Sequence, residues 1–600
     1  MIQSKYAYLP DGAAVYENAV HKNALFILQK QLMDKPQWDK FVYVFTERPD
    51  QNDLGWRGEY FGKMMRGACL TYRYLPNDEL YDILFDTVRG ILDARDADGR
   101  ITTYIKEAEF CGWDMWTRKY VIVGCLYFYG ICRDEAFKAR IITAMRGQVD
   151  YLIEKLGEDK LSILDTSQWW GGLNSSSILE PIVELYKLTG EDRYLTFAKY
   201  ILEAGGCKDG NLLELAEEGK LSPYEYPVVK AYEMMSYFEG ALAYYEVTGE
   251  TRYLNIVEKF VDAVRDTDIT IIGCAGCTHE LFDHSAVKQT EETEPLAIMQ
   301  ETCVTVTWMR LQERLLRLTG KVIYAEGIEQ SALNALYGSL NYEGLPQLSK
   351  EENIRVNGLP FDSYSPLTFK ARGIGIGGYK KFSTGGYYGC CACIGAAGTA
   401  LFPLMSVMAQ ADGFVMNEYN NGTVTASTPA GNPVTLTVSG YFFDEGQATV
   451  TLGLDAPEVF TLRLRVPAWS HKPTLTVNGE TRAVESGYVD LTREWKNGDK
   501  LTLECYPEVE IAELNGKIAF TFGALTLARD EQKESGDIEA PVALTLKDGK
   551  PVVNQLDAED GETVRFLLKT ADGDLLLTDY ASCGKHWLEE RNRISVWLNR

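Results

Sequence analysis

The sequence has few basic residues and lacks any long apolar run. Its 60 lysines and arginines are outnumbered by 86 aspartates and glutamates, which gives a formal net charge of −26. A surface of this sign repels phosphate backbones and anionic lipid, so we expect neither nucleic acid nor a membrane as a partner. No segment approaches about 18 uninterrupted apolar residues, and we therefore predict no membrane-spanning helix.

A secretion signal is also lacking, and this absence guides the interpretation of the 13 cysteines. The first twenty residues, MIQSKYAYLPDGAAVYENAV, contain no basic stretch followed by an apolar one, so the expected location is cytoplasmic. The cysteine count is odd, and clusters form at Cys274 and Cys277, at Cys303, and at Cys390, Cys391 and Cys393. Without a secretion signal, such clusters indicate metal binding or catalysis more than disulfides.

A repeated pattern organises the first two thirds of the chain. Five segments consist of an apolar helix, a polar turn and an aromatic residue that opens a second helix. These aromatic residues are Tyr81, Phe137, Tyr194, Tyr253 and Tyr324. A helix pair of about 60 residues cannot bury its own apolar face, whereas five or six pairs closed into a ring can. We therefore predict an α/α-toroid from about residue 10 to about residue 410, with an open helical solenoid as the alternative.

The character of the sequence changes after residue 410. Short alternating runs rich in Thr, Val and Leu, such as FTLRLRVPAWS and KLTLECYPEVEI, are interrupted by Gly, Pro and Asn. This pattern is typical of β-sandwich or jelly-roll strands. We predict a multidomain α + β protein with an α/α-toroid catalytic domain at 1–410 and β-sandwich domains at 411–512 and 513–600.

Two short motifs carry chemistry. Cys390 and Cys391 are adjacent in a glycine-rich loop, GGYYGCCACIGAAG, and adjacent thiols can share a metal more readily than they form a strained disulfide. Glu301 and Cys303 place a carboxylate and a thiol two residues apart. Together these four side chains would suit a tetrahedral zinc ion.

Other interpretations remain open at this point. Buried free cysteines are common small hydrophobic residues. Cys274-x-x-Cys277 has the commoner spacing of a metal knuckle, and with Cys390 and Cys391 it would complete a structural four-thiolate site. Glu280, in the segment Thr-His-Glu, is either a general acid or an ordinary surface carboxylate.

The combination of motifs resembles glycoside hydrolase family 127, which is typified by β-L-arabinofuranosidases, and its relative family 146. The resemblance rests on Glu-Thr-Cys at 301–303, the later Cys-Cys pair, QWWGGLNSSSILEPIVELYKLTG from Gln168, KAYEMMSYFEGALAYYEVTG from Lys230, and LRLRVPAW from Leu462. Pro-Pro-Asn, which often follows the cysteine pair in arabinofuranosidases, is absent here. This departure leaves the expected zinc chemistry in place but puts the identity of the sugar in question.

The resemblance implies a Zn2+ site formed by Glu301, Cys303, Cys390 and Cys391. It also implies that Cys390 is the nucleophile, with Cys391 the second choice, and that Glu280 is the general acid/base. Acid-assisted attack by a thiolate, followed by hydrolysis of a thioglycosyl intermediate, retains the anomeric configuration. The predicted activity is therefore that of a retaining exo-glycoside hydrolase releasing β-L-arabinofuranose or a related sugar.

Substrate-binding candidates are polar or aromatic residues near the predicted helix starts. They are Trp116, Trp169, Trp170, Lys230, Tyr232 and His279. The aromatic residues could stack on a sugar or pack within the toroid. Lys230 stands where arabinofuranosidases often carry a histidine before Ala-Tyr, and it could receive an acidic or differently hydroxylated sugar.

Two other kinds of function are also consistent with these residues. One is a non-catalytic carbohydrate-binding or scaffold protein with a structural zinc site. Another is a metal-free toroid enzyme such as an epimerase, which the presence of only five histidines disfavours. In each case the expected partner is a carbohydrate, and a homodimer is one compatible assembly.

Overall fold

The computed structural model describes residues 1–278, 280–291, 299–349, 354–375, 378–533, 536–559, 561–587 and 591–600. Within these residues, six inner helices form a closed ring, because each packs against the next and α16 packs against both α14 and α3. The inner helices are α3 (Gly58–Tyr74), α5 (Asp114–Ile131), α8 (Leu179–Thr189), α11 (Ala231–Thr248), α14 (Thr302–Thr319) and α16 (Cys390–Ser406). Closure confirms the predicted α/α-toroid, and the open solenoid is wrong.

Outer helices follow the inner ones along the chain, as the repeat pattern predicted. They are α4 (Asp78–Asp93), α6 (Glu135–Lys155), α9 (Asp192–Glu203), α12 (Thr251–Thr267) and α15 (Val322–Ser331), while α1 (Ala19–Ile27) packs on α16 and α2 (Lys35–Glu47) packs on α3 and α4. Gly190, Gly249 and Gly320 end three inner helices with φ of 67°, 74° and 67°. This left-handed conformation favours glycine, which explains the repeated Thr-Gly turns.

Short elements fill the loops between the helix pairs. The helices are α7 (Leu173–Ser176), α10 (Leu212–Glu218) and α13 (Ser285–Lys288). The strands are β2 (Gly206–Cys207), β3 (Gly210–Asn211), β4 (Met299–Glu301), β5 (Gln347–Ser349), β6 (Ile354–Val356), β7 (Tyr364–Pro366), β8 (Lys370–Ala371), β9 (Ile374–Gly375), β10 (Tyr379–Lys381) and β11 (Tyr387–Gly389). Most of these strands lie in the two long insertions that flank α14 and α15.

Two sheets follow the toroid and share one core. The larger has the order β1-β14-β15-β16-β21-β18-β19 and the smaller β12-β13-β17-β20. Their bounds are β1 (Ala14–Tyr16), β12 (Val407–Gln410), β13 (Gly413–Met416), β14 (Gly422–Ser427), β15 (Pro433–Tyr441), β16 (Gln447–Leu454), β17 (Glu458–Val466), β18 (Thr474–Val477), β19 (Glu480–Ala483), β20 (Gly487–Trp495) and β21 (Lys500–Glu504), with α17 (Phe442–Glu445) between β15 and β16. Leu436, Val450, Leu462 and Trp495 are among the buried residues between the sheets.

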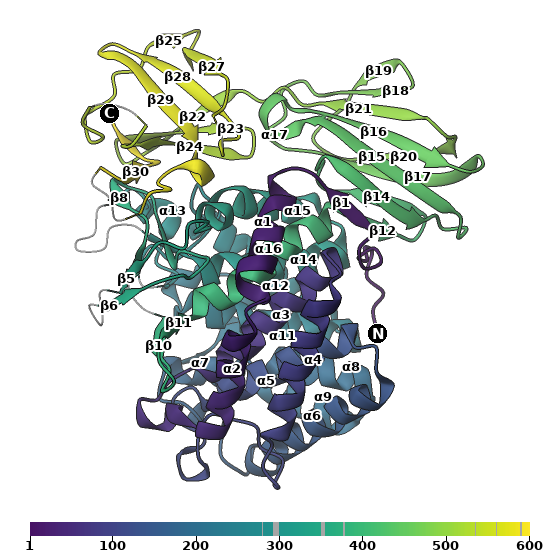
Figure 1. Cartoon of the computed structure of the whole chain (residues 1–600), viewed down its shortest axis with the longest axis vertical. Helices are drawn as coiled ribbons and strands as arrows, with labels where there is room; N and C mark the ends of the chain where they lie inside the picture. Colours follow the sequence, from purple (N-terminus) through teal and green to yellow (C-terminus); the bar gives the residue numbers. More distant parts are fainter. Residues whose placement is uncertain are drawn as a thin grey trace.

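A third sheet completes the chain. Its central order is β22-β23-β24-β29-β28-β27, with β30, β31 and β8 at its margins. The strands are β22 (Val509–Leu514), β23 (Lys517–Phe522), β24 (Leu525–Asp530), β27 (Val553–Leu556), β28 (Arg565–Thr570), β29 (Gly573–Asp579), β30 (Arg593–Ser595) and β31 (Leu598–Asn599), beside a small hairpin of β25 (Leu546–Lys547) and β26 (Lys550–Pro551). Figure 1 shows both β-rich regions, in green and yellow, above the helical part.

The helical and β-rich parts are joined by strands and by buried charge. β1 pairs with β14, and β8 pairs with β30, so segments that precede residue 410 complete sheets that follow it. The fully buried Arg465 of β17 bonds Glu329 of α15 at 2.6 Å and Glu418 at 2.9 Å. The division at residues 410 and 512 stays a prediction. Among the described residues, none of the helices combines the length and apolar character needed to cross a bilayer.

Candidate functional site

The four predicted metal ligands lie at the N-terminal ends of two neighbouring inner helices. Glu301 is the N-cap of α14, and Cys303 lies in its first turn. Cys390 and Cys391 are the first two residues of α16. Because α14 and α16 pack together, the positive ends of both helix dipoles meet at one place. Such helix starts stabilise thiolates.

Short strand pairs in the insertions fix where these two helices begin. Strand β4 leads directly into α14 and pairs with β7, which sets Glu301 opposite Tyr364. Strand β11 leads directly into α16 and pairs with β10. The long insertions thus position the ligands, in agreement with the usual functional role of long loops.

The ligand atoms of Glu301, Cys303, Cys390 and Cys391 all lie within 4.8 Å of one another, and all four residues are buried. The Cys390 and Cys391 sulfurs are 3.9 Å apart, and the Cys391 sulfur lies 3.4 Å from Glu301 Oε1. The second carboxylate oxygen, Oε2, is buried and has no hydrogen-bond partner among the described residues. The cluster is therefore able to hold a metal ion.

The protonation of the cluster supports the same conclusion. Hydrogen bonds from the Cys303 and Cys391 thiols hold the pKa of Cys390 well below its usual range. Burial, and then the Cys390 thiolate beside it, raise the pKa of Glu301 to about 8. Burial also raises the pKa values of Cys303 and Cys391 well above their usual range. Four buried acids this close cannot all ionise without a compensating cation, which a bound metal would supply.

The alternative thiol pair lies outside this cluster. The Cys274 sulfur contacts the carbonyl oxygens of Ala275 and Glu301, and the Cys277 sulfur accepts from Gln300 Nε2 at 3.2 Å. Within the described residues, neither belongs to a group of potential metal ligands. Cys393 is also outside it, fully buried one turn along α16.

Glu280 is held by two partners. Its carboxylate accepts hydrogen bonds from the Tyr364 hydroxyl and from the Lys230 ammonium group. Glu280 itself has φ of 67°, a conformation that few residues other than glycine adopt. Tyr364 lies opposite Glu301 in the β4–β7 pair. Because its hydroxyl donates to Glu280, Glu280 lies near the same cluster.

The predicted substrate-binding residues occupy different environments. Trp169 and Trp170 remain 41% and 38% exposed, and the Trp170 ring lies 5.7 Å from Lys230 Nζ. Trp116 and Tyr232 are buried and contact a lysine instead of open solvent. His279 lies outside the described residues. A substrate role for these side chains stays a prediction.

Two charged residues of α3 were missed in the sequence. Lys63 donates to Glu59 Oε1 at 3.0 Å and to the Cys303 sulfur at 3.8 Å. Glu59 also accepts from the Trp116 indole, and burial raises the pKa of Glu59 to about 7. The sequence signal was a Glu and a Lys four residues apart in a helix rich in apolar residues, but nothing local linked them to a cysteine 240 residues away.

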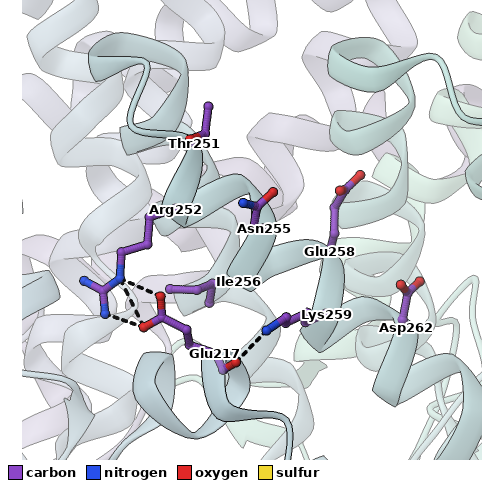
Figure 2. Close-up of a pocket in the computed structure, with 8 residues that line it drawn as sticks. All are labelled: Glu217, Thr251, Arg252, Asn255, Ile256, Glu258, Lys259 and Asp262. Atoms are coloured by element: carbon purple, nitrogen blue, oxygen red, sulfur yellow. Dashed lines mark hydrogen bonds and ion pairs between the residues drawn. The ribbon is translucent and has the colours of Figure 1, made fainter.

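A separate groove of about 540 Å³ lies on the outer surface, along α10 and α12. Figure 2 shows that Glu217 bonds Arg252 through its carboxylate and Lys259 through its backbone oxygen. The other two acidic residues of the groove, Glu258 and Asp262, pair with Lys321 and Arg265 outside it. It contains none of the predicted site residues.

Comparison with known proteins identifies the family of this chain. A family model described as the GH127 catalytic domain of β-L-arabinofuranosidase matches residues 6–346, more than half of the chain. The chain belongs to glycoside hydrolase family 127. The model of the GH127 middle domain matches residues 413–506, within the first β-rich region. As a GH127 member the protein is a glycoside hydrolase, and its substrate is a carbohydrate.

Individual relatives are distant in sequence but similar in fold. A non-reducing end β-L-arabinofuranosidase of Bifidobacterium longum is 20% identical over 542 residues, which cover 79% of this chain and 76% of that protein. The solved structure of a GH127 β-L-arabinofuranosidase from Geobacillus stearothermophilus T6 matches with a TM-score of 0.74 at 16% identity, covering 98% of this chain and 99% of that one. A second GH127 β-arabinofuranosidase structure matches with a TM-score of 0.75 at 16% identity, covering 99% and 98%. These structures confirm the predicted combination of a toroid with β-rich domains.

Proposed function

We propose that this GH127 member is a retaining exo-glycoside hydrolase whose nucleophile is the Cys390 thiolate, bound to zinc, and whose general acid/base is Glu280. The observation that carries the proposal is the buried cluster of one carboxylate and three thiols at two helix N-termini. The proposed sugar is β-L-arabinofuranose or a close relative, because the similar proteins are named as enzymes that act on it.

Zinc is the metal that suits this donor set best. Three sulfurs and one carboxylate oxygen favour a soft, tetrahedral site over the all-oxygen shells of magnesium or calcium. Two thiolates on one tetrahedral zinc, each bound at about 2.3 Å, lie about 3.8 Å apart. The Cys390 and Cys391 sulfurs lie 3.9 Å apart in the structure. When bound, zinc would keep the cysteines deprotonated at neutral pH and would make the buried negative charge tolerable.

Cys390 is the thiol best placed to reach a sugar. Its exposure is 9%, compared with 1% for Cys391 and 0% for Cys303. In the first step, Glu280 donates a proton to the leaving oxygen while the Cys390 sulfur attacks the anomeric carbon, which forms a thioglycosyl bond and releases the aglycone. In the second step, the Glu280 carboxylate takes a proton from water, whose oxygen displaces the sulfur and restores the thiolate.

The charge of the site favours a neutral sugar. Lys230, which the sequence suggested as a partner for an acidic sugar, is already paired with Glu280. Lys63 is paired with Glu59. The carboxylates and thiolates outnumber the ammonium groups around the cluster, so a sugar carboxylate would be repelled and the positive charge that develops on the sugar ring would be stabilised. The cytoplasm is the proposed location, in keeping with 13 free thiols.

Metal content and turnover, measured on one preparation, test the proposal. Zinc would be determined by elemental analysis, and p-nitrophenol release would be followed with a panel of aryl glycosides led by the β-L-arabinofuranoside. We expect about one zinc per chain and loss of activity in both Cys390→Ser and Glu280→Gln. Zinc without turnover on any sugar would favour the alternative of a carbohydrate-binding protein with a structural metal, and absence of zinc in reduced protein would refute the proposal.

A further inference from the structure

Lys63 is a buried lysine that contacts only one of the three cluster thiols. Its side chain is 2% exposed. Its ammonium group donates to the Cys303 sulfur at 3.8 Å, and within the described residues it makes no hydrogen bond to Cys390 or Cys391. The metal-binding cluster is therefore asymmetric, because Cys303 accepts a hydrogen bond from an ammonium group whereas, among the described residues, Cys390 and Cys391 accept none from one.

The surroundings of Lys63 keep its charge in place. Its ammonium group lies 4.5 Å from the centre of the Tyr232 ring, 5.5 Å from that of Tyr120 and 5.6 Å from that of Trp116. These aromatic faces favour a cation and exclude water. The Glu59 carboxylate accepts a hydrogen bond from the same ammonium group at 3.0 Å and balances its charge. These surroundings suit a lysine in its charged form.

A charge-assisted N–H···S bond draws electron density from the sulfur that accepts it. Partners of this kind, one shell outside a metal, orient the ligands and tune their reactivity. A cationic partner stabilises the deprotonated sulfur that a metal requires and fixes its orientation, while the loss of electron density makes this thiolate a poorer nucleophile than one without such a partner. The contact of Lys63 thus distinguishes Cys303 from Cys390 although both would bind the same ion.

We propose that Lys63 is a positioning residue that holds Cys303 as a permanent metal ligand and thereby directs nucleophilic attack to Cys390. This inference rests on the proposed function, because it concerns which thiolate of the zinc site reacts with the sugar. Trp116 and Tyr232, which the sequence suggested as sugar-binding residues, would then act chiefly by enclosing Lys63.

The test compares Lys63→Met, which removes the charge but fills the aromatic enclosure, with Lys63→Arg, which keeps the charge. The matched control is Lys119→Met. Lys119 is also buried, and its ammonium group lies 4.4 Å from the centre of the same Trp116 ring, but among the described residues it has no hydrogen-bond partner. Zinc affinity would be measured by competition with a chromophoric chelator. The order in which iodoacetamide alkylates the cluster cysteines would be mapped by peptide mass spectrometry on zinc-loaded protein.

We expect Lys63→Met to bind zinc about 10- to 100-fold more weakly and to be alkylated at Cys303 as well as Cys390. Lys63→Arg should restore both properties, and Lys119→Met should match the wild type in both. An unchanged alkylation pattern in Lys63→Met, or a loss of affinity equal to that of Lys119→Met, would overturn the proposal. If Lys63→Met does not fold, Lys63→Gln provides the same readouts. Neither measurement requires a substrate, so this inference can fail or succeed independently of the proposed hydrolysis.

Discussion

Replacing Gly378 with alanine would displace the proposed nucleophile by a calculable amount. Gly378 precedes β10, its carbonyl accepts from the Cys390 backbone N–H at 3.0 Å, and a Cβ built on it lies 2.7 Å from the Cys390 sulfur. Ordinary contact begins at 3.4 Å, so the sulfur must move by about 0.7 Å or more. Because misplacement of a reacting atom by about 1 Å can lower a rate about 100-fold, we expect kcat to fall by roughly that factor.

Backbone strain is separated from this displacement by a matched variant. Gly378 has φ of +84°, so alanine there also carries a strain of about 1–3 kcal/mol. Gly385 lies in the turn between β10 and β11, has φ of +94°, and has no atom within 4 Å of a built Cβ. Gly385→Ala should therefore lose similar stability but keep its kcat. Turnover of an aryl glycoside, zinc content and melting temperature would be measured for both variants, and equal kcat values would refute the reasoning.

Three further predictions concern the metal, the domain junction and the alternative thiols. Zinc binding at pH 7 should release about three protons, because burial raises the pKa of Glu301 to about 8 and raises those of two ligand thiols further. Zinc affinity should therefore fall as the pH falls. Calorimetry in two buffers of different ionisation enthalpy counts the released protons, and release of fewer than about two protons would contradict the expected protonation of the ligands. Arg465→Met should destabilise the protein by about 3–5 kcal/mol, because it leaves the buried Glu329 and Glu418 without their cation. Arg463→Met, which breaks a partly exposed pair with Asp490 and a hydrogen bond to Tyr6, should cost only about 1 kcal/mol. Chemical denaturation measures the free energy of unfolding of the two variants, and equal losses of stability would contradict the larger contribution expected from the buried ion pairs. Cys277→Ser should retain its full zinc content by elemental analysis. A metal-free Cys277→Ser protein would instead show that Cys274 and Cys277 bind the metal.

The toroid could be predicted from the sequence because its signals are local. Each helix pair has its own apolar periodicity and its own turn, and Gly190, Gly249 and Gly320 end helices in the conformation expected from the Thr-Gly pattern. The contribution of β1 to a sheet formed some 400 residues later could not be predicted in this way. Pairing between distant strands depends on tertiary packing, which a three-residue segment does not encode.

The site was predictable to a lesser degree. Spacing alone favoured Cys274 and Cys277, and the family resemblance was needed to choose Glu301 and Cys303. Aromatic residues near helix starts suggested sugar contacts, but Trp116 is buried against two lysines. Periodicity shows which helix face is apolar, but in a toroid whose inner helices are buried on all sides it does not show which turn faces the site.

In the proposed mechanism the sugar becomes covalently bound to the Cys390 sulfur. Zinc-loaded Glu280→Gln, mixed with an activated aryl β-L-arabinofuranoside, should accumulate this species, because the good leaving group needs no acid while hydrolysis of the intermediate needs the missing base. The measurement is peptide mass spectrometry after acid quenching. We expect one added sugar on the peptide that contains Cys390. A sugar found on a carboxylate, or on no residue during measurable aglycone release, would contradict the proposed mechanism.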